Sequence, residues 1–164
     1  MHRDTFLLMP LNELLKTCTM KGFQGSGPGG QHRNKTNTGV SLRLDEYKLE
    51  IKSCESRSAN ENKTRALHRM QMALALKVRE EPPPLEKLSF PGSQGRIQSS
   101  NRLFPLFIAQ VLDIVAANRG DTKPAAAAFK LSPSALTRIL HQEKSVVEQV
   151  QKLRQEGGKP KLRL

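Results

Sequence analysis

The pattern of apolar and polar positions predicts that the chain begins with a small α+β domain. Residues 39–44 and 49–51 alternate between the two classes, which is the period of half-buried strands, and they predict a hairpin. Residues 17–23 predict an earlier strand, preceded by a short helix that Asn12 would cap. From residue 58 to 79 the period is helical, with an apolar stripe at Leu67, Met70, Leu74 and Leu76.

A change of composition then predicts a linker and a second, all-helical unit. Residues 82–102 are rich in Pro, Gly, Ser and Gln and have no clear period. Later, helix starts are indicated by Pro124, by Ser132 and by a Ser-x-x-Glu capping box at 145–148. We therefore expect an α+β domain at 1–81, a linker at 82–102, a helical module at 103–158 and a basic tail at 159–164.

Two interpretations of the helical module remain open. The spacing of residues 122–139 fits the two helices of a helix-turn-helix, which is common in DNA-binding regulators. The same spacing occurs in plain helical bundles, which we favour. A DNA-binding function would predict sequence-specific duplex binding by residues 103–164.

Charge narrows the class of partner. The chain holds 27 Lys and Arg against 15 Asp and Glu, a net charge of +12, and this excess favours a polyanion such as nucleic acid. No apolar run approaches the roughly 20 residues that span a membrane. Cys18 and Cys54 have no metal-ligand spacing and suggest a reducing compartment. We expect a cytoplasmic monomer with no membrane partner, no metal and no cofactor.

The most unusual stretch is residues 25–31, Gly-Ser-Gly-Pro-Gly-Gly-Gln, which can bring its own backbone close to another surface. Its glycine spacing fits a degenerate dinucleotide motif, but polar residues and a hairpin follow where a crossover helix is required. A Walker loop is excluded because Gln31 and His32 stand where Lys and Ser or Thr are needed. Residues 14–44 contain no Asp or Glu but several cations, which suits insertion among phosphates.

Two motifs together carry a family resemblance over residues 12–79. Residues 26–36, Ser-Gly-Pro-Gly-Gly-Gln-His-Arg-Asn-Lys-Thr, resemble the catalytic loop of class I peptide-chain release factors. Downstream, Arg57-Ser58, Asn62-Lys63 and Ala66-Leu67 are similar to a second motif of that family. The chain departs from the family at Ala59, where glutamine is usual, so an RNA contact at that position is in doubt.

The resemblance implies hydrolysis of the ester between a nascent peptide and the terminal ribose of its tRNA, with Gly29, Gly30 and Gln31 as catalytic residues. No titratable residue lies between Gln24 and Gln31, so a general base from this tip is not expected. The Gln31 N–H would stabilise the oxyanion, its side chain would orient water, and Gly29 and Gly30 would permit close approach. The resemblance also allows N-methylation of the Gln31 amide.

Basic residues around the two motifs and in the tail are the candidate RNA contacts: Lys21, Arg33, Lys35, Arg57, Lys63, Lys159, Lys161 and Arg163. For Arg57, a helix-entry contact within its own domain is an equal alternative. His32 is interpreted as a flank of the loop, and His68 and His141 as packing or surface residues.

Because the loop begins at residue 25, we expect no codon-reading domain before it, and the chain is more similar to codon-independent ribosome-rescue factors. The expected partners are the ribosome, its 23S-type rRNA at the peptidyl-transferase centre and peptidyl-tRNA, and a contact with the mRNA channel stays open. The alternative is a non-catalytic or partner-dependent ribosome- or RNA-binding protein that retains the loop.

Overall fold

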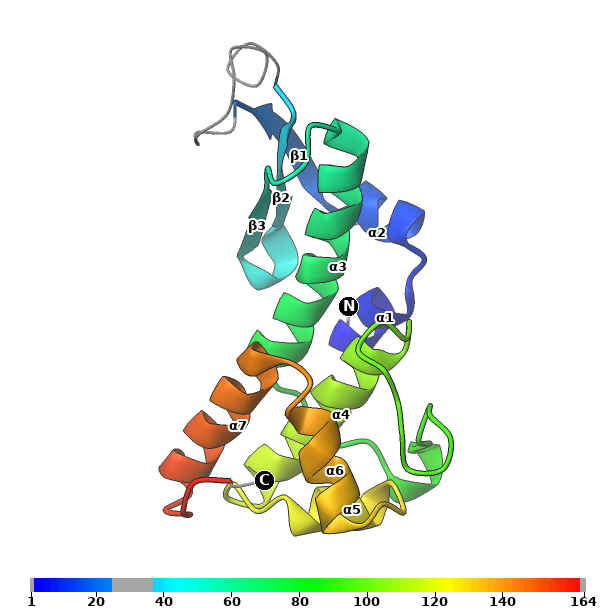
Figure 1. Cartoon of the computed structure of the whole chain (residues 1–164), viewed down its shortest axis with the longest axis vertical. Coiled ribbons are helices and arrows are strands. Elements are labelled where there is room, and N and C mark those ends of the chain that lie inside the picture. Colours follow the sequence, from blue (N-terminus) through cyan, green and yellow to red (C-terminus); the bar gives the residue numbers. More distant parts are fainter. Residues whose placement is uncertain (1, 25–36, 163–164) are drawn as a thin grey trace. The chain divides into compact units, whose positions relative to one another are not determined.

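The structure, a computed structural model, describes residues 2–24 and 37–162 (Figure 1). The chain divides into two compact units, Met1–Leu74 and Ala75–Leu164, with the division inside a long helix. In chain order the helices and strands are α1 (Arg3–Leu8), α2 (Leu11–Thr17), β1 (Thr19–Phe23), β2 (Gly39–Leu44), β3 (Leu49–Ser53), α3 (Ala59–Lys77), α4 (Phe104–Ala117), α5 (Lys123–Ala128), α6 (Pro133–Leu140) and α7 (Lys144–Glu156). The predicted fold class, an α+β part followed by helices, is confirmed.

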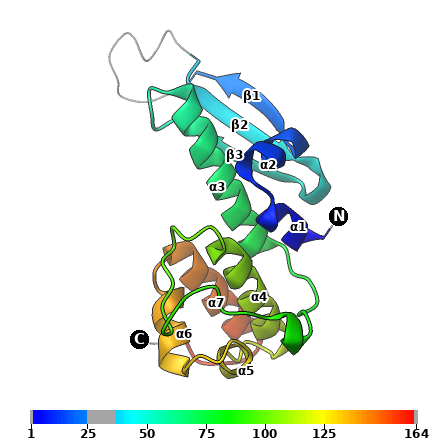
Figure 2. The same cartoon turned by 90° about the vertical axis from the view of Figure 1, so that its right-hand side faces the viewer.

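The first unit is built on an antiparallel sheet of order β1-β2-β3, along which α3 lies (Figure 2). Val40, Leu42 and Leu44 alternate along β2 and are buried, while Arg43 between them is exposed. This period of two places one face of the strand in the core and the other in water. The predicted hairpin is confirmed, and its turn passes through a 3₁₀ helix at Asp45–Tyr47.

The two N-terminal helices complete the core of the same unit. Phe6, Leu7 and Leu14 are at most 1% exposed. On α3, the Gln71 amide donates to the carbonyl of Leu7 at 3.4 Å. The prediction that Asn12 caps α2 is wrong, because Pro10 is the extended residue whose carbonyl accepts from the first turn. The helix therefore begins one residue before Asn12 and runs to Thr17, so β1 starts two residues later than predicted.

In the second unit, α4 is the central apolar helix, with Phe104, Phe107, Ile108 and Leu112 at most 1% exposed. The predicted cap at Ser132 is confirmed, because its hydroxyl accepts from the Ala135 N–H at 3.2 Å. The predicted capping box at 145–148 is wrong. Glu143 is the extended residue before α7, and Ser145 therefore lies inside the helix.

The segment predicted as a linker, residues 82–102, packs within the second unit. Ile97 is 6% exposed, and the Phe90 ring meets the edge of Phe107 with centroids 5.4 Å apart. A segment without a hydrophobic period can still be held by single buried side chains, because each contributes about 1.5–3 kcal/mol. The segment predicted as a linker therefore contains side chains that pack in the second unit.

The described part of the basic tail is also held in place. On α7, Gln151 donates to the Leu162 carbonyl and accepts from its N–H, both at 2.9 Å. Arg154 donates to the Pro160 carbonyl at 2.8 Å. The Lys159 N–H also donates to the Arg154 carbonyl at 2.7 Å, so Lys159 and Lys161 are exposed on a backbone that is held in place.

A buried ion pair fixes the segment after α3 within the second unit. Asp113 of α4 is fully buried, and its Oδ1 lies 3.0 Å from Nη1 of Arg79. The same oxygen accepts from the Glu80 N–H at 3.2 Å, and Arg79 donates to the Ala109 carbonyl. The charge is thus surrounded by hydrogen bonds, which offset its loss of hydration.

Among the described residues, no helix combines the length and the apolar character that crossing a lipid bilayer requires.

Replacing Asp113 by Ala should lower the free energy of unfolding by about 3–5 kcal/mol, because it leaves the Arg79 charge largely buried without its partner. Urea unfolding followed by circular dichroism measures this loss. The control is Glu148→Ala, which breaks the exposed Lys144–Glu148 pair and should cost under about 1 kcal/mol. Equal costs for the two variants would contradict this role of Asp113.

Candidate functional site

The predicted catalytic residues Gly29, Gly30 and Gln31 lie outside the described residues, as do Arg33, Lys35 and Arg163. What the structure describes is the base of the glycine loop, which consists of residues 24 and 37–38 with the strands β1 and β2. The chemistry expected of the loop depends on how this base holds the chain where it enters and leaves the loop.

On the side of the loop, the pairing of β1 with β2 ends at Phe23 and Gly39. A Cβ on Gly39 would lie 2.7 Å from the Phe23 carbonyl oxygen and 2.8 Å from its ring. Residue 39 must therefore be glycine for the aromatic ring to cover the strand pair. Sequence reasoning missed this requirement and read Gly39 only as the start of a strand.

Asn62, on the first turn of α3, connects the loop base to the helix. It is fully buried, and its amide nitrogen donates to the Thr38 carbonyl at 2.7 Å and to the Ser56 carbonyl at 2.8 Å. Its side-chain oxygen accepts from the Ser56 N–H at 2.9 Å. One side chain therefore holds both Thr38, which lies just before β2, and the turn between β3 and α3.

The second sequence motif forms this β3–α3 turn. The Ser58 hydroxyl accepts from the Glu61 N–H at 3.3 Å and its carbonyl accepts from the Asn62 N–H, which is how an N-cap residue closes a helix start. The Ser56 hydroxyl donates to Glu61 at 2.5 Å. Asn62 was noted in the sequence as part of the motif without a role. Its burial early in a helix, where an amide needs hydrogen-bond partners, is the observation that assigns Asn62 a structural role.

A carboxylate network supports the same turn. Glu55 accepts from the Ser53 hydroxyl at 2.6 Å, from the Cys54 N–H and from Nη1 of Arg69 at 2.7 Å. The Ser53 hydrogen bond, then that of Arg69, lowers the pKa of Glu55 to about 2. At neutral pH this carboxylate is ionised and links the end of β3 to α3.

Among the predicted RNA contacts of this unit, Lys21 is exposed on β1, Arg57 is exposed in the β3–α3 turn, and Lys63 is half-buried on α3. Arg57 and Lys63 therefore flank the turn that Asn62 organises. Lys159 and Lys161 belong to the second unit.

Sequence reasoning missed a second cation beside Lys21. Lys21 pairs with Ser41 and Ser41 pairs with Lys52, so the three side chains share the outer face of the sheet. Glu50 lies on the same strand as Lys52, and the Ser41 hydrogen bond, then Lys52, lowers its pKa. The alternation of charge along β3 is the signal that could have identified Lys52.

In the described ranges, no three His, Cys, Asp or Glu side chains are grouped so that they could hold a metal ion.

Replacing Asn62 by Asp should lower the free energy of unfolding by about 1–3 kcal/mol, because the carboxylate cannot donate to the two carbonyls that the amide satisfies. Thermal and urea unfolding measure the loss. The matched control is Asn60→Asp, two residues earlier and exposed on the same turn, which should be nearly neutral. A loss of the same size in both variants would show that Asn62 does not tie the turn.

The Glu55 network predicts a pH dependence of stability. Because the folded pKa lies below the value of 4.5 for a free glutamate, the stabilisation is present at pH 7 and is lost as the pH falls toward 2. Glu55→Gln should therefore melt below the wild type at pH 7, and the difference should shrink on acidification. A melting difference that is unchanged at pH 2.5 would contradict the assignment.

Comparison with known families adds an independent finding. The family model described as the RF-1 domain matches residues 13–103, more than half of the chain, and the match includes the glycine loop, Asn62 and α3. Searches of curated proteins and of solved structures found no match. Together with the resemblance of its two motifs, this match shows that the chain belongs to the RF-1 domain family, the catalytic-domain family of class I release factors.

Proposed function

We propose that this protein hydrolyses the peptidyl-tRNA ester on stalled ribosomes without reading a codon. Members of the RF-1 domain family hydrolyse peptidyl-tRNA on the ribosome, and the match supports a release-factor-like, ribosome-associated function. The observation that carries the proposal is the Gly-Gly-Gln sequence at 29–31 inside the matched domain. The base of this loop is held to α3 by the hydrogen bond between Asn62 and Thr38.

The chemistry proposed for the tip is positional. Between Gln24 and Gln31 the sequence offers backbone amides and one amide side chain, but no titratable group. A preorganised N–H at Gln31 stabilises the oxyanion that forms when water attacks the ester, and the side chain orients that water. Proton transfer is left to the RNA and the substrate. Gly29 and Gly30 allow the backbone to approach the ester.

Catalysis by position requires a fixed attachment, because a shift of about 1 Å can cost about 100-fold in rate. The loop base supplies it on both sides. On one side, Phe23 covers Gly39 within the sheet. On the other side, Thr38 is held by the buried Asn62 at 2.7 Å. These contacts support a loop that is presented from a rigid platform.

The described segments on each side of the loop belong to packed units. On the N-terminal side, α1 and α2 bury Phe6, Leu7 and Leu14 in the core of the same unit as the sheet. Beyond residue 74, the described chain forms a helical unit whose exposed tail lysines, Lys159 and Lys161, suit contact with RNA.

Replacing Gln31 by Ala should slow peptide release by about 10²–10³-fold, because the side chain that positions the water is removed. The measurement is release of labelled peptide from ribosomes stalled at the end of an mRNA that lacks a stop codon. Gly30→Ala should have an effect of at least this size, because a Cβ blocks the close approach of the backbone.

The matched control is Gln24→Ala, which removes the same side chain at the exposed start of the loop and should leave release within about threefold of the wild type. Release that survives Gly30→Ala would contradict the proposed mechanism. Salt-sensitive ribosome binding by the wild type with no release from any complex would instead favour a non-catalytic RNA-binding protein.

A further inference from the structure

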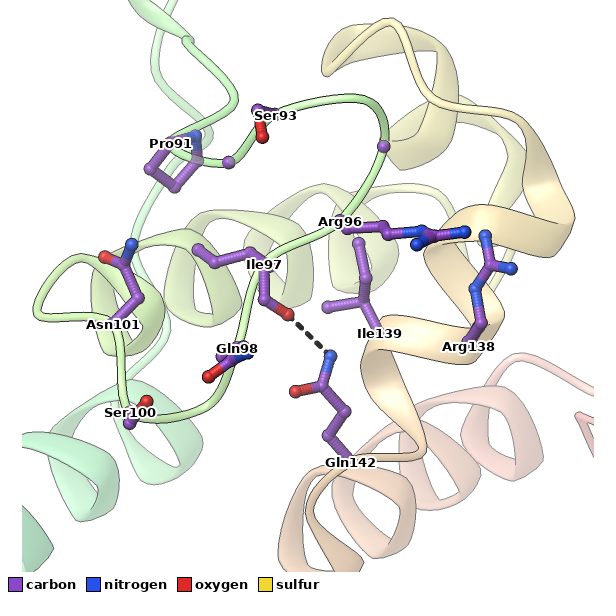
Figure 3. Close-up of a pocket in the computed structure, with 12 residues that line it drawn as sticks. Pro91, Ser93, Arg96, Ile97, Gln98, Ser100, Asn101, Arg138, Ile139 and Gln142 are labelled. Carbon is purple, nitrogen blue, oxygen red and sulfur yellow. Dashed lines mark hydrogen bonds between the residues drawn. The ribbon is translucent and has the colours of Figure 1, made fainter.

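The second unit contains a cavity of about 880 Å³ between residues 91–101 and α6 (Figure 3). Its wall combines two arginines with neutral polar side chains and contains no Asp or Glu. The polar and charged residues around it include Ser93, Arg96, Gln98, Asn101, Arg138 and Gln142. A hollow with donors and positive charge but no carboxylate is suited to an anion.

The two arginines are the main reason to assign a ligand. Arg96 and Arg138 come from different segments, both line the cavity, and both guanidinium groups point to the same end of it (Figure 3). Within the described part of the chain, neither guanidinium has a hydrogen-bond or ion-pair partner. Arg138 also borders a neighbouring hollow that includes Glu86, and no ion pair joins these two side chains. Two like charges held together without a carboxylate favour an anion between them.

A tight turn fixes the backbone that carries Arg96. Ser93 and Arg96 exchange two backbone hydrogen bonds, at 3.0 and 2.9 Å, across Gln94 and Gly95. Both central residues have positive φ, 49° and 68°, as in the tight turns of hairpins. A Cβ on Gly92 would lie 2.1 Å from the Arg96 carbonyl oxygen, so glycine is required beside the turn.

Gln142 connects this turn segment to the end of α6. Its amide nitrogen donates to the Ile97 carbonyl at 2.7 Å (Figure 3). Its side-chain oxygen accepts from the Ser99 N–H at 3.0 Å. The Ile97 side chain is 6% exposed and anchors the same stretch. Arg138 is exposed on α6, whose start is capped by Ser132. The two arginines therefore extend from backbones that are fixed before any ligand binds.

We propose that the Arg96–Arg138 cleft binds a phosphate group of an RNA strand. Two guanidinium groups provide paired donors that match the oxygens of one phosphodiester. The Ser93 hydroxyl and the Gln98 and Asn101 amides provide further donors for the phosphate and sugar, without selecting a sequence. RNA is the polyanion concerned because the family function is ribosome-associated, and on this point the inference rests on the proposed function.

The cleft is distinct from the glycine loop. It lies wholly in the second unit, and Arg138 falls outside the family match at 13–103. The cleft would thus add an RNA contact to the matched domain, through the segment that the sequence alone describes as a linker.

The test measures RNA binding by the full chain. A fluorescent 12-nucleotide single-stranded RNA is titrated with the wild type and with Arg96→Gln and Arg138→Gln at several KCl concentrations. Each substitution should weaken binding about 10-fold, because it removes a charged hydrogen bond to phosphate. Each should also reduce the slope of log K against log salt by about 0.7. The double variant should lose less than the product of the two, because both side chains hold one group.

Two further variants serve as controls. Lys152→Gln removes one exposed charge of α7 away from the cleft and should change the affinity by less than about threefold. Arg138→Lys keeps the positive charge but removes the paired N–H donors of the guanidinium group. The salt dependence of binding should therefore persist while the affinity falls. Unchanged melting temperatures show that the variants fold. If Arg96→Gln and Arg138→Gln behave like Lys152→Gln, the inference is wrong.

Other sources of phosphate are separate arms of the test. If inorganic phosphate or AMP binds the wild type but not the double variant, and RNA affinity is unchanged, the cleft takes a small phosphate compound and the RNA assignment falls. Tighter, arginine-dependent binding to a 20-base-pair DNA duplex would overturn it in favour of DNA. Arginine-dependent RNA binding by a wild type that releases no peptide would uphold the cleft and refute the proposed function.

Discussion

The structure of the loop base depends on the hydrogen bonds of Asn62. Its buried amide donates to the carbonyls of Thr38 and Ser56 and accepts from the Ser56 N–H, so one side chain satisfies three backbone groups. Buried backbone groups without partners are costly, and no other side chain at this turn replaces all three bonds at once. The direction in which the chain enters β2 from the glycine loop is therefore set by a residue that lies 24 positions later.

This dependence gives the two sequence motifs a physical relation. The first motif offers amides but no acid or base between Gln24 and Gln31, so the catalysis proposed for this tip is positional. The second motif caps α3 and carries the asparagine that holds the tip's base. Two further contacts stabilise the neighbouring backbone. The Glu55 carboxylate binds Arg69 of α3, and the Phe23 ring packs over Gly39. On this account, the motifs belong to one functional unit because the tip requires a fixed support.

The elements with strong periods could be predicted from the sequence, because the hairpin, α3 and α4 bury regular faces. The cap at Ser132 followed from local chemistry in the same way. The segment 82–102 could not be predicted, because its order comes from single contacts, such as those of Ile97 and Gln142, that are distant in sequence. The capping box at 145–148 failed because local propensity does not fix where a helix begins. The roles of Gly39 and Asn62 in the site depend on cross-strand and turn contacts, and the motif alone does not reveal them.

The central claim is that this chain releases peptides without reading a codon. The most direct measurement compares peptide release rates from three ribosomal complexes, with no codon, a sense codon or a stop codon in the site next to the peptidyl-tRNA. The account predicts rapid release from the complex with no codon and no requirement for a stop codon. Release confined to the stop-codon complex would contradict it.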